Sequence, residues 1–588
     1  MVCYGVIFVA VFANTVQINT LAQYLIMKPF LALLFIVSTF CNAQNQLYPQ
    51  DYFSNPLDIP IILSGTFAEL RSNHFHSGMD IKTQQRIGLK VKAAANGYVS
   101  RIKISHYGYG KALYVTHPNG YITVYAHLDK FSPEIESYIK KKQYENESYE
   151  IEVFPKANEL NVTKDALIAY SGNSGGSGGP HLHFEIRDNA ERPINPMLFG
   201  INVKDTTIPM VTALYAYPMD ESSHVNGSNS LQKIKLIPQP NGDYYTEGVC
   251  AFGHIGFGIS TWDRQDLGAN KNGVSNIQTF ANGRKTFELD FKRFSFDETK
   301  HINQLIDYKF YKQHKQRIQK LFVDNNALSM YKDVERNGIL TVEDSTNLMV
   351  KIKVSDFKNN TAWVTLNMAG RKTDGIVPNT PYTTPYFIDH NTSTTLHEGS
   401  ISVSISPNTF YNDVYLDFKV QNDTLMLHED IIPMQKSLAI AFNIEKYAEA
   451  EKQKLYIAKL YGYNKTPNYS LTKRNGDTLT TFTNSLGEFA LAMDTIKPKI
   501  SALNFKNAQW LSNYRFLKVQ IEDEESGISN YRGTINGKWI LMAYDYKTKT
   551  LTYDFKDMDN TNTKNELKVI VTDNVGNNST FEATFYRK

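Results

Sequence analysis

The sequence of 588 residues is poor in cysteine and has no dominant charge. Of its cysteines, Cys3 and Cys41 fall in an N-terminal segment expected to be removed, so Cys250 alone would remain and no intramolecular disulfide can form. The 62 basic and 59 acidic residues nearly cancel, which argues against a nucleic-acid partner, because that partner normally requires a clustered basic face. A negative mean hydropathy excludes a multi-span membrane protein, and the length predicts three or four domains.

Near the N-terminus, an apolar run has the organisation of an export signal. Met27-Lys28 precedes the apolar residues 30–40, and Cys41-Asn42-Ala43 provides a small-residue cleavage site. We expect a signal peptide over residues 1–43, with Met27 the candidate true start. The alternative is an uncleaved anchor, but the run is shorter than the roughly 20 residues that a span requires. The sequence therefore predicts export to the periplasm or cell envelope, with no transmembrane span in the mature chain.

The most informative motif is His181-Leu182-His183, followed by Glu185. In a β-strand, residues two apart project from the same face, so these side chains would point into one site. About a hundred residues upstream, His76 and Asp80 flank Gly78, whose flexibility can let both turn toward one ion. Together these segments offer the nitrogen and oxygen donors that suit zinc.

A β-rich block is expected around these motifs. Residues 93–99, 112–117 and 121–128 are short apolar or alternating runs, and Pro118-Asn119-Gly120 between the last two is a strong hairpin signal. Residues 134–149 are polar and rich in lysine and glutamate, and they are interpreted as a helical or mobile insertion.

The glycine-rich residues 171–180 match two unrelated motifs. They contain the GxSxG pattern of serine hydrolases, but that turn leads into a helix, whereas here Pro180 and an alternating run follow. A phosphate-binding loop does not fit either, because its lysine and hydroxyl residue are missing. A mobile rim that brings backbone close to a ligand fits the composition better.

The order HxxxD, Tyr-Ala-His-Leu, glycine-rich loop and Pro-His-Leu-His-Phe-Glu resembles the lysostaphin/LytM-type zinc metallopeptidases, which cut peptide bonds in bacterial peptidoglycan. The likeness covers about 150 residues. It implies that His76, Asp80 and His183 bind one zinc ion per chain, while His127 and His181 act beside it as catalytic residues. Three protein ligands leave a fourth position for water, as in catalytic zinc sites. Which of the two catalytic imidazoles is the base stays open.

Other histidines and the remaining cysteine have ordinary structural interpretations. His74, His106 and His117 are expected to be surface or hydrogen-bonded residues, and Glu185 is either an acceptor that orients a ligand imidazole or a structural strand residue. Cys250, four residues before His254, is interpreted as a small apolar strand residue in preference to a nucleophile with its base.

Two features depart from the family pattern. Asp165 stands where the family usually turns on glycine, and the insertion at 134–149 lengthens one edge of the expected groove. Both bear on substrate access and neither touches the expected metal ligands.

The C-terminal two thirds contain one unit twice. Gly273-Val274-Ser275-Asn276 and Gly527-Ile528-Ser529-Asn530 are each followed, at the same spacing, by Asn-Gly and a basic residue. Each copy has an Asp-Thr pair and a proline upstream and an aspartate downstream. In the first copy these are Asp205-Thr206 to Pro209 and Val354-Ser355-Asp356. In the second they are Asp494-Thr495 to Pro498 and Val571-Thr572-Asp573. The two units resemble bacterial immunoglobulin-like β-sandwiches. The first is interrupted by a more helical insert at residues 287–347.

The predicted fold is therefore mainly β. A LytM-like antiparallel β peptidase domain at 47–200 is followed by an immunoglobulin-like module at 201–372, a further β-rich module at 373–493 and a second immunoglobulin-like module at 494–588. The modules are expected to act as spacers, to stabilise the chain or to adhere to the wall, and they offer surfaces for a cell-envelope protein partner. No cofactor motif or calcium loop is recognisable in them.

The leading hypothesis is an exported zinc metallo-endopeptidase that hydrolyses peptide cross-links of peptidoglycan. The alternative is a catalytically silent LytM-like regulator or scaffold that binds cell-wall hydrolases or wall polymer. Regulators of that kind typically lose metal ligands, and this sequence keeps them.

Overall fold

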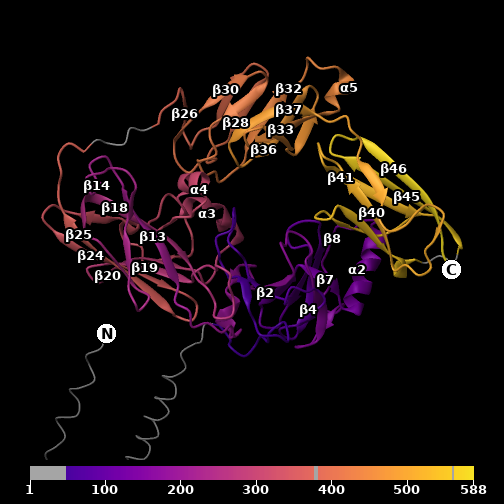
Figure 1. Ribbon diagram of the computed structural model, residues 1–588, viewed down its shortest axis with the longest axis horizontal. Helices are drawn as coiled ribbons and strands as arrows, with labels where there is room; N and C mark the ends of the chain where they lie inside the picture. The colour runs from indigo at the N-terminus through magenta and orange to yellow at the C-terminus, as the bar shows by residue number, and fades with distance from the viewer. Residues whose placement is uncertain (1–47, 377–381, 559–561) are drawn as a thin grey trace, which may run out of the picture. The chain divides into compact units, whose positions relative to one another are not determined.

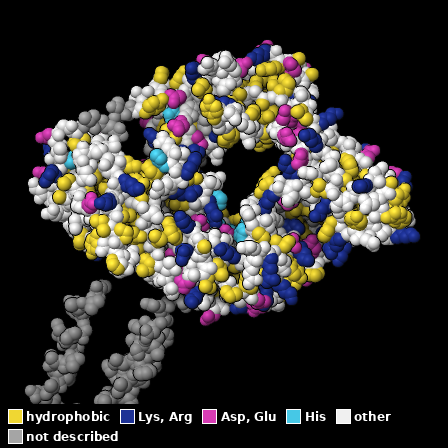
Figure 2. Space-filling view, in the orientation of Figure 1, with side chains coloured by type: hydrophobic (Ala, Val, Ile, Leu, Met, Phe, Trp, Pro, Cys, Tyr) yellow, Lys and Arg dark blue, Asp and Glu magenta, His cyan; other side chains and the backbone are white. Residues whose placement is uncertain are grey.

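The computed structural model describes residues 48–376, 382–558 and 562–588. The expected signal peptide at 1–43, with Met27, lies outside the described residues. The described chain is mainly β, as the sequence predicts, and its strands form several sheets (Figure 1). Among the described residues, no helix combines the length and the apolar character that crossing a bilayer requires. Basic and acidic side chains are interspersed over the visible face (Figure 2).

A nine-stranded sheet supports the region that carries the histidine motifs. Its main path is β1 (Leu63–Gly65), β2 (Met79–Lys82), β11 (His181–Arg187), β6 (Ile122–Ala126), β5 (Lys111–Thr116), β4 (Gly97–Ile104) and β8 (Ile151–Val153). β12 (Pro193–Ile194) pairs with β11, and β9 (Asn161–Val162) pairs with β4. A separate three-stranded sheet consists of β3 (Lys90–Lys92), β10 (Leu167–Ser171) and β7 (Leu128–Phe131).

The hairpin predicted at Pro118-Asn119-Gly120 is confirmed. β5 and β6 pair antiparallel, with Thr116 opposite Ile122, and Gly120 adopts a φ of 85°. The run 93–99 does not form the single strand that its apolar character suggests, because a bend after β3 precedes β4, which begins at Gly97.

The polar insertion is a helix, α2 (Pro133–Glu145). Proline is accepted in the first turn because its missing N–H would have no helical partner there, and Glu134 and Glu136 complement the positive end of the helix dipole. Ile135 and Ile139 are buried, so the helix is anchored by one apolar edge while its charged face meets solvent.

The next module forms one network of thirteen paired strands. The network contains β13 (Met210–Pro218), β14 (His224–Val225), β15 (Gln232–Ile234), β16 (Leu236–Pro238), β17 (Tyr244–Thr246), β18 (Val249–Trp262), β19 (Asn276–Ala281), β20 (Arg284–Asp290), β21 (Gln319–Lys320), β22 (Tyr331–Lys332), β23 (Leu340–Val342), β24 (Asn347–Ser355) and β25 (Thr361–Gly370). It is not divided into two separate sheets, because β25 pairs antiparallel with β24 and parallel with β18. The predicted insert carries the helices α3 (Ile302–Leu305) and α4 (Tyr308–His314).

This module shares its core with the peptidase-like region. Phe67 and Phe75 belong to the same buried cluster as Phe294, and the centroid of the Phe294 ring lies 5.4 Å from those of both other rings. The boundary expected at residue 200 is therefore crossed by a continuous apolar core.

The middle module has two five-stranded sheets and a two-stranded one. The first sheet contains β27 (Thr394–Glu398), β28 (Ile401–Ile405), β32 (Leu438–Asn443), β36 (Thr478–Thr483) and β35 (Thr472–Asn475). The second contains β30 (Phe418–Gln421), β31 (Thr424–Leu427), β37 (Gly487–Met493), β33 (Leu455–Tyr461) and β34 (Thr466–Tyr469). The short pair is β26 (Tyr386–Ile388) with β29 (Val414–Leu416), and α5 is Glu449–Lys452. Ile440 and Phe442 of the first sheet share a core with Ile457 and Phe489 of the second.

The C-terminal module has the same two-sheet plan. One sheet contains β38 (Lys499–Ala502), β40 (Phe516–Glu522), β44 (Thr550–Asp554) and β43 (Met542–Asp545). The other contains β39 (Gln509–Trp510), β46 (Asn578–Tyr586), β45 (Lys564–Asp573), β41 (Ile528–Ile535) and β42 (Lys538–Trp539). Val519 and Leu551 of the first share a core with Val569 and Phe585 of the second.

Candidate metal centre

The segments that carry His76, Asp80 and His183 meet where β2 and β11 pair in the nine-stranded sheet. β11 pairs with β2, which places His183 directly opposite Asp80, and His76 lies in the loop before β2. The side-chain distances are 3.0 Å from His76 Nε2 to Asp80 Oδ1, 3.1 Å from His76 Nε2 to His183 Nδ1 and 2.9 Å from His183 Nδ1 to Asp80 Oδ1. Two nitrogens and one carboxylate oxygen therefore converge on one point.

Gly78 permits this convergence for a different reason from the flexibility suggested by the sequence. A Cβ atom at this position would lie 2.3 Å from the carbonyl oxygen of Phe184 in β11, closer than any real side chain approaches. The glycine is needed because the chain that links His76 to Asp80 packs directly against the neighbouring strand.

The donor set fits a zinc ion. Zinc binds imidazole nitrogen and carboxylate oxygen at about 2.0–2.2 Å, so three donors about 3 Å apart are close enough to share one ion. The three residues are buried, with exposed fractions of 5% for His76, 8% for Asp80 and 3% for His183. Burial keeps competing water away from the donors.

Each imidazole of this set is held by a second partner through its other nitrogen. His76 Nδ1 donates to the backbone carbonyl of Thr66 at 2.7 Å, and His183 Nε2 donates to Glu185 Oε1 at 2.8 Å. Such outer hydrogen bonds orient a ligand ring and increase its basicity. Of the two interpretations of Glu185 that the sequence leaves open, its contact supports that of an orienting acceptor.

Glu185 is itself fully buried and held by four groups. Its carboxylate accepts hydrogen bonds from His183, from Ser77 Oγ at 2.7 Å, from Arg187 Nε at 2.6 Å and from the Tyr109 hydroxyl. Burial raises the pKa of Glu185, but the charge of Arg187 and the hydrogen bond from His183 outweigh it and hold that pKa well below its usual range. The carboxylate is therefore ionised and fixed in place.

The electrostatics of the triangle favour an ionised Asp80. Burial raises the pKa of Asp80, but the charge of His76 and hydrogen bonds from His181, His183 and His76 outweigh it and keep that pKa well below its usual range. Burial lowers the pKa of His183, but the hydrogen bonds to Asp80 and Glu185 reverse this and raise it to about 9. The anionic surroundings that stabilise a proton here are those that stabilise a cation.

His127 and His181 lie beside this triangle. The centroids of their rings are 4.7 Å apart, and His181 Nε2 lies 3.4 Å from Asp80 Oδ1. His127 Nδ1 donates to the carbonyl of Ser174 at 2.9 Å, and His181 Nδ1 donates to the carbonyl of Gly179 at 2.8 Å. With Nδ1 protonated, a neutral imidazole presents an unprotonated Nε2.

His127 is held in an uncommon backbone conformation. Its φ is 57°, in the left-handed region that non-glycine residues rarely occupy and that concentrates at functional sites. Burial and the neighbouring imidazoles of His183 and His181 lower the pKa of His127 to about 3. Its ring is therefore neutral at physiological pH and can accept a proton.

The glycine-rich loop forms the rim that holds His127 and His181. A Cβ atom on Gly110, whose φ is 63°, would lie 2.5 Å from Ser174 Oγ. Ser174 Oγ accepts from the Lys111 N–H at 3.0 Å and donates to the carbonyl of Leu128 at 2.7 Å. The loop is thus clamped to the strands by close backbone contacts, in contrast to the mobile rim that its composition suggests.

The remaining histidines of this region lie outside the site. His74 is exposed and contacts Asn73, while the ring of His106 stacks on Tyr149 at 5.0 Å. His117 is buried, with Nδ1 2.8 Å from the carbonyl of Asn96 and Nε2 2.8 Å from Thr123 Oγ1. The structural interpretation of all three is confirmed.

Cys250 and His254 do not form a catalytic pair. Both lie on β18, where four residues separate them by about 13 Å, and His254 Nδ1 bonds Asp220 Oδ2 at 2.7 Å. Cys250 is a free thiol in a strand.

Two buried residues of the site were missed by sequence reasoning. Arg187 and Tyr109 fix Glu185, and the Tyr109 ring stacks on His183 with centroids 5.2 Å apart. Arg187 continues the alternation of His181, His183 and Glu185 along β11, so its place on the same face was readable from the sequence. Tyr109 follows no such periodicity.

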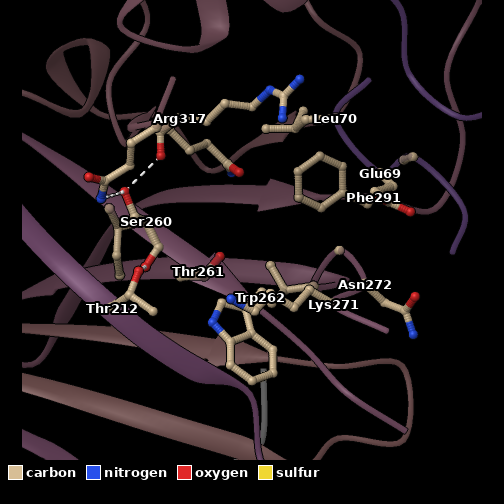
Figure 3. A pocket seen from close by; sticks show the side chains of 16 residues that line it. Glu69, Leu70, Thr212, Ser260, Thr261, Trp262, Lys271, Asn272, Phe291 and Arg317 are labelled. Atoms are coloured by element: carbon tan, nitrogen blue, oxygen red, sulfur yellow. Dashed lines mark hydrogen bonds between the residues drawn. The ribbon is translucent and has the colours of Figure 1, made fainter. Parts of the chain in front are cut away.

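A cavity of about 240 Å³ lies where the peptidase-like region meets the first β module (Figure 3). Glu69, Trp262, Lys271 and Arg317 are among its lining residues. The lining contains no residue of the metal triangle, so this cavity is not the expected reaction site.

Comparisons with known proteins agree with this geometry. Residues 74–144 match the model of peptidase family M23, and residues 385–494 match that of the Zu5-like domain. The DD-carboxypeptidase/endopeptidase Mpg of Neisseria meningitidis serogroup B is 32% identical over 138 residues, which are 24% of this chain and 26% of that protein. An uncharacterized metalloprotease of Haemophilus influenzae is 34% identical over 122 residues, 21% of this chain and 20% of that protein.

Solved structures also align with this part of the chain. The catalytic domain of lysostaphin from Staphylococcus simulans is 24% identical, with a TM-score of 0.17, and the alignment covers 24% of this chain and 88% of that domain. The chain spans about a quarter of the length of the curated relatives it matches. The family match and the Neisseria relative confirm the resemblance to lysostaphin/LytM-type peptidases; the matched residues 74–144 contain His76, Asp80 and His127 and end before His183.

Proposed function

We propose that the protein is an exported zinc-dependent metallo-endopeptidase that hydrolyses peptide cross-links of bacterial peptidoglycan. The observation that carries the proposal is the convergence of His76, Asp80 and His183. Two of them, His76 and Asp80, lie in residues 74–144, which match a peptidase family. The expected substrate follows from that family resemblance, and the name of the Neisseria relative, a DD-carboxypeptidase/endopeptidase, is consistent with it. Export and residence in the periplasm or cell envelope rest on the N-terminal segment at 1–43.

In this proposal His76, Asp80 and His183 hold one zinc ion. When bound, zinc supplies Lewis-acid activation of a water molecule and of the scissile carbonyl. Glu185 and the Thr66 carbonyl keep the two ligand imidazoles in their orientation.

The neighbouring imidazoles of His127 and His181 accept and return the proton of the attacking water. His127 and His181 each donate Nδ1–H to a backbone carbonyl, so a neutral ring has an unprotonated Nε2 that can accept a proton from the attacking water. Nε2 of His181 also lies 3.4 Å from Asp80 Oδ1. The same ring, once protonated, becomes a hydrogen-bond donor that can stabilise the developing oxyanion or return the proton to the leaving amine. Both residues are assigned as catalytic, with the division of these roles open.

The β modules are proposed to space the peptidase region from, or attach it to, other envelope components. The boundaries 47–200, 201–372, 373–493 and 494–588 describe this organisation. The competing function, a silent regulator or scaffold for cell-wall hydrolases or wall polymer, is disfavoured because a regulator has no need of a complete set of donors with buried second partners.

Digestion of purified sacculi tests the proposed function. The secreted chain is incubated with sacculi in the presence of zinc, in the presence of a chelator, and as the variant His183→Ala. The expected result is release of cross-link peptides, identified by mass spectrometry, only from the zinc-loaded wild-type protein. Equal release in all three reactions would contradict enzymatic function, and binding to sacculi with no release would favour the regulator.

A further inference from the structure

The first β module contains a second cluster of acidic side chains, far from the histidines in the sequence. Asp205 lies in the segment before β13, Asp263 directly follows β18, and Asp356 directly follows β24. One carboxylate oxygen from each lies within 4.8 Å of the others. Three negative charges are thus held together by three separate parts of the module.

The carboxylate of Asp263 is buried, and although the backbone of Arg264 donates a hydrogen bond to it, one of its oxygens has no donor within the described part of the chain. Its exposed fraction is 3%, and among the described residues none donates a hydrogen bond to its Oδ1 atom. Burial, and then repulsion from Asp205 and Asp356, raises the pKa of Asp263 to about 7. Burying an unpaired carboxylate costs several kcal/mol unless a counter-charge is present.

A small cavity adjoins the cluster. Its volume is about 20 Å³, and Asp205 and Asp263 are among its lining residues. A cavity of roughly 10–15 Å³ by this measure holds one water-sized sphere. The exposed Lys358 also lines it, and its charge opposes the rise that burial causes in the pKa of Asp205 and Asp356. Its Nζ atom lies 3.5 Å from Asn202 Oδ1.

The C-terminal module contains the corresponding cluster, Asp494, Asp523 and Asp573. Its hydrogen bonds reproduce those of the first module. Asn360 donates to both oxygens of Asp356 at 2.8 and 2.7 Å, and Asn577 donates to both oxygens of Asp573 at the same distances.

The two clusters differ at the middle aspartate. In the C-terminal module the Gly527 N–H donates to Asp523 Oδ1 at 2.7 Å. In the first module the equivalent Gly273 N–H donates instead to Thr66 Oγ1, at 3.0 Å. The glycine N–H that donates to Asp523 in the C-terminal module has a different acceptor in the first module. Asp263 therefore lacks this hydrogen bond.

From these contacts we propose that Asp205, Asp263 and Asp356 bind a calcium ion. The donors are carboxylate oxygens, which hard cations prefer, and calcium accepts the irregular geometries that loops provide, whereas magnesium requires near-ideal octahedra. The ion takes the place of the missing glycine N–H at Asp263. It joins the segment that leaves the peptidase-like region to two strand ends of the module.

Calcium titration of the full-length chain, with zinc already supplied, tests the site. The test variant is Asp263→Asn, and the matched control is Asp523→Asn in the C-terminal module. Isothermal titration with calcium chloride is expected to give one saturable site in the wild-type protein and in Asp523→Asn. Asp263→Asn is expected to weaken the affinity at least about tenfold.

Thermal unfolding supplies a readout that does not depend on peptidase activity. Without calcium, Asp263→Asn is expected to unfold at a temperature equal to or above that of the wild type, because the substitution removes an uncompensated charge. Calcium is expected to raise the Tm of the wild type and not that of the variant. Equal calcium responses in both proteins, stabilisation by magnesium to the same extent, or no saturable binding at calcium concentrations on the order of 10 mM would overturn the proposal.

Discussion

His183 Nε2 donates a hydrogen bond to Glu185 Oε1 at 2.8 Å, two residues further along the same strand. This contact leaves Nδ1 of His183 facing His76 and Asp80. The buried carboxylate thus determines which nitrogen of the ligand imidazole is directed at the metal site.

Substitution of Glu185 by glutamine is expected to weaken zinc binding about 10- to 100-fold, because outer carboxylates of this kind orient and polarise a ligand histidine. Competition with a chromophoric chelator measures the affinity. Glu191→Gln is the matched control, since Glu191 contacts the same Arg187 at 3.3 Å but is exposed. Equal zinc affinity in the two variants would show that Glu185 does not act through His183.

His127→Ala is expected to retain zinc and to lower the rate of peptide hydrolysis about 10²- to 10⁴-fold, the usual contribution of a general acid or base. Zinc content by mass spectrometry and turnover are measured on the same sample. His74→Ala serves as the control, because that exposed residue contacts Asn73 outside the site. A His127 variant that lost both zinc and activity would assign this residue to metal binding instead.

The clamp on the glycine-rich loop can be tested with a pair of glycines. Gly110→Ala introduces a Cβ atom 2.5 Å from Ser174 Oγ, whereas a Cβ atom on Gly108, with a similar φ of 60°, meets nothing within 4 Å. Both variants incur the left-handed backbone cost of about 1–2 kcal/mol. Gly110→Ala is expected to lose a further 1–3 kcal/mol or so from overpacking, measured by urea unfolding. Equal free energies of unfolding would argue against a tightly held rim.

The buried His117 provides a prediction on pH. Burial, partly offset by the hydrogen bond to the Asn96 carbonyl, lowers the pKa of His117, so the unfolded state binds a proton more readily than the folded state. Stability from this group is complete above the unfolded pKa of about 6.5 and declines as the pH falls below it. His117→Gln is expected to lose less unfolding free energy than the wild type as the pH falls from 7.5 to about 5, measured by denaturant unfolding. An unchanged pH profile would indicate that His117 is not buried as a neutral ring.

Local sequence patterns predicted the parts of the site that depend on one strand or one turn. The two-residue spacing of His181, His183 and Glu185 predicted a shared face, because strand side chains alternate. The hairpin at Pro118-Asn119-Gly120 predicted the pairing of β5 with β6, since glycine supplies the positive φ of the turn.

Features that join distant segments had no such signature. The Thr66 carbonyl that orients His76 is a backbone group, so no residue type in the sequence predicts this contact. The cluster of Asp205, Asp263 and Asp356 comes from three separated segments, and its unusual member depends on a hydrogen bond that Gly273 makes elsewhere. Long-range contacts of this kind follow from the packing of whole sheets.

The central claim is that one zinc ion, held by His76, Asp80 and His183, drives hydrolysis. Titration of metal-free protein with zinc, with bound metal and peptide release from sacculi measured in the same samples, tests it most directly. The account predicts a rate that rises in proportion to bound zinc and levels off at one ion per chain, and no hydrolysis by His183→Ala. Hydrolysis at the wild-type rate by zinc-free protein or by His183→Ala would contradict it.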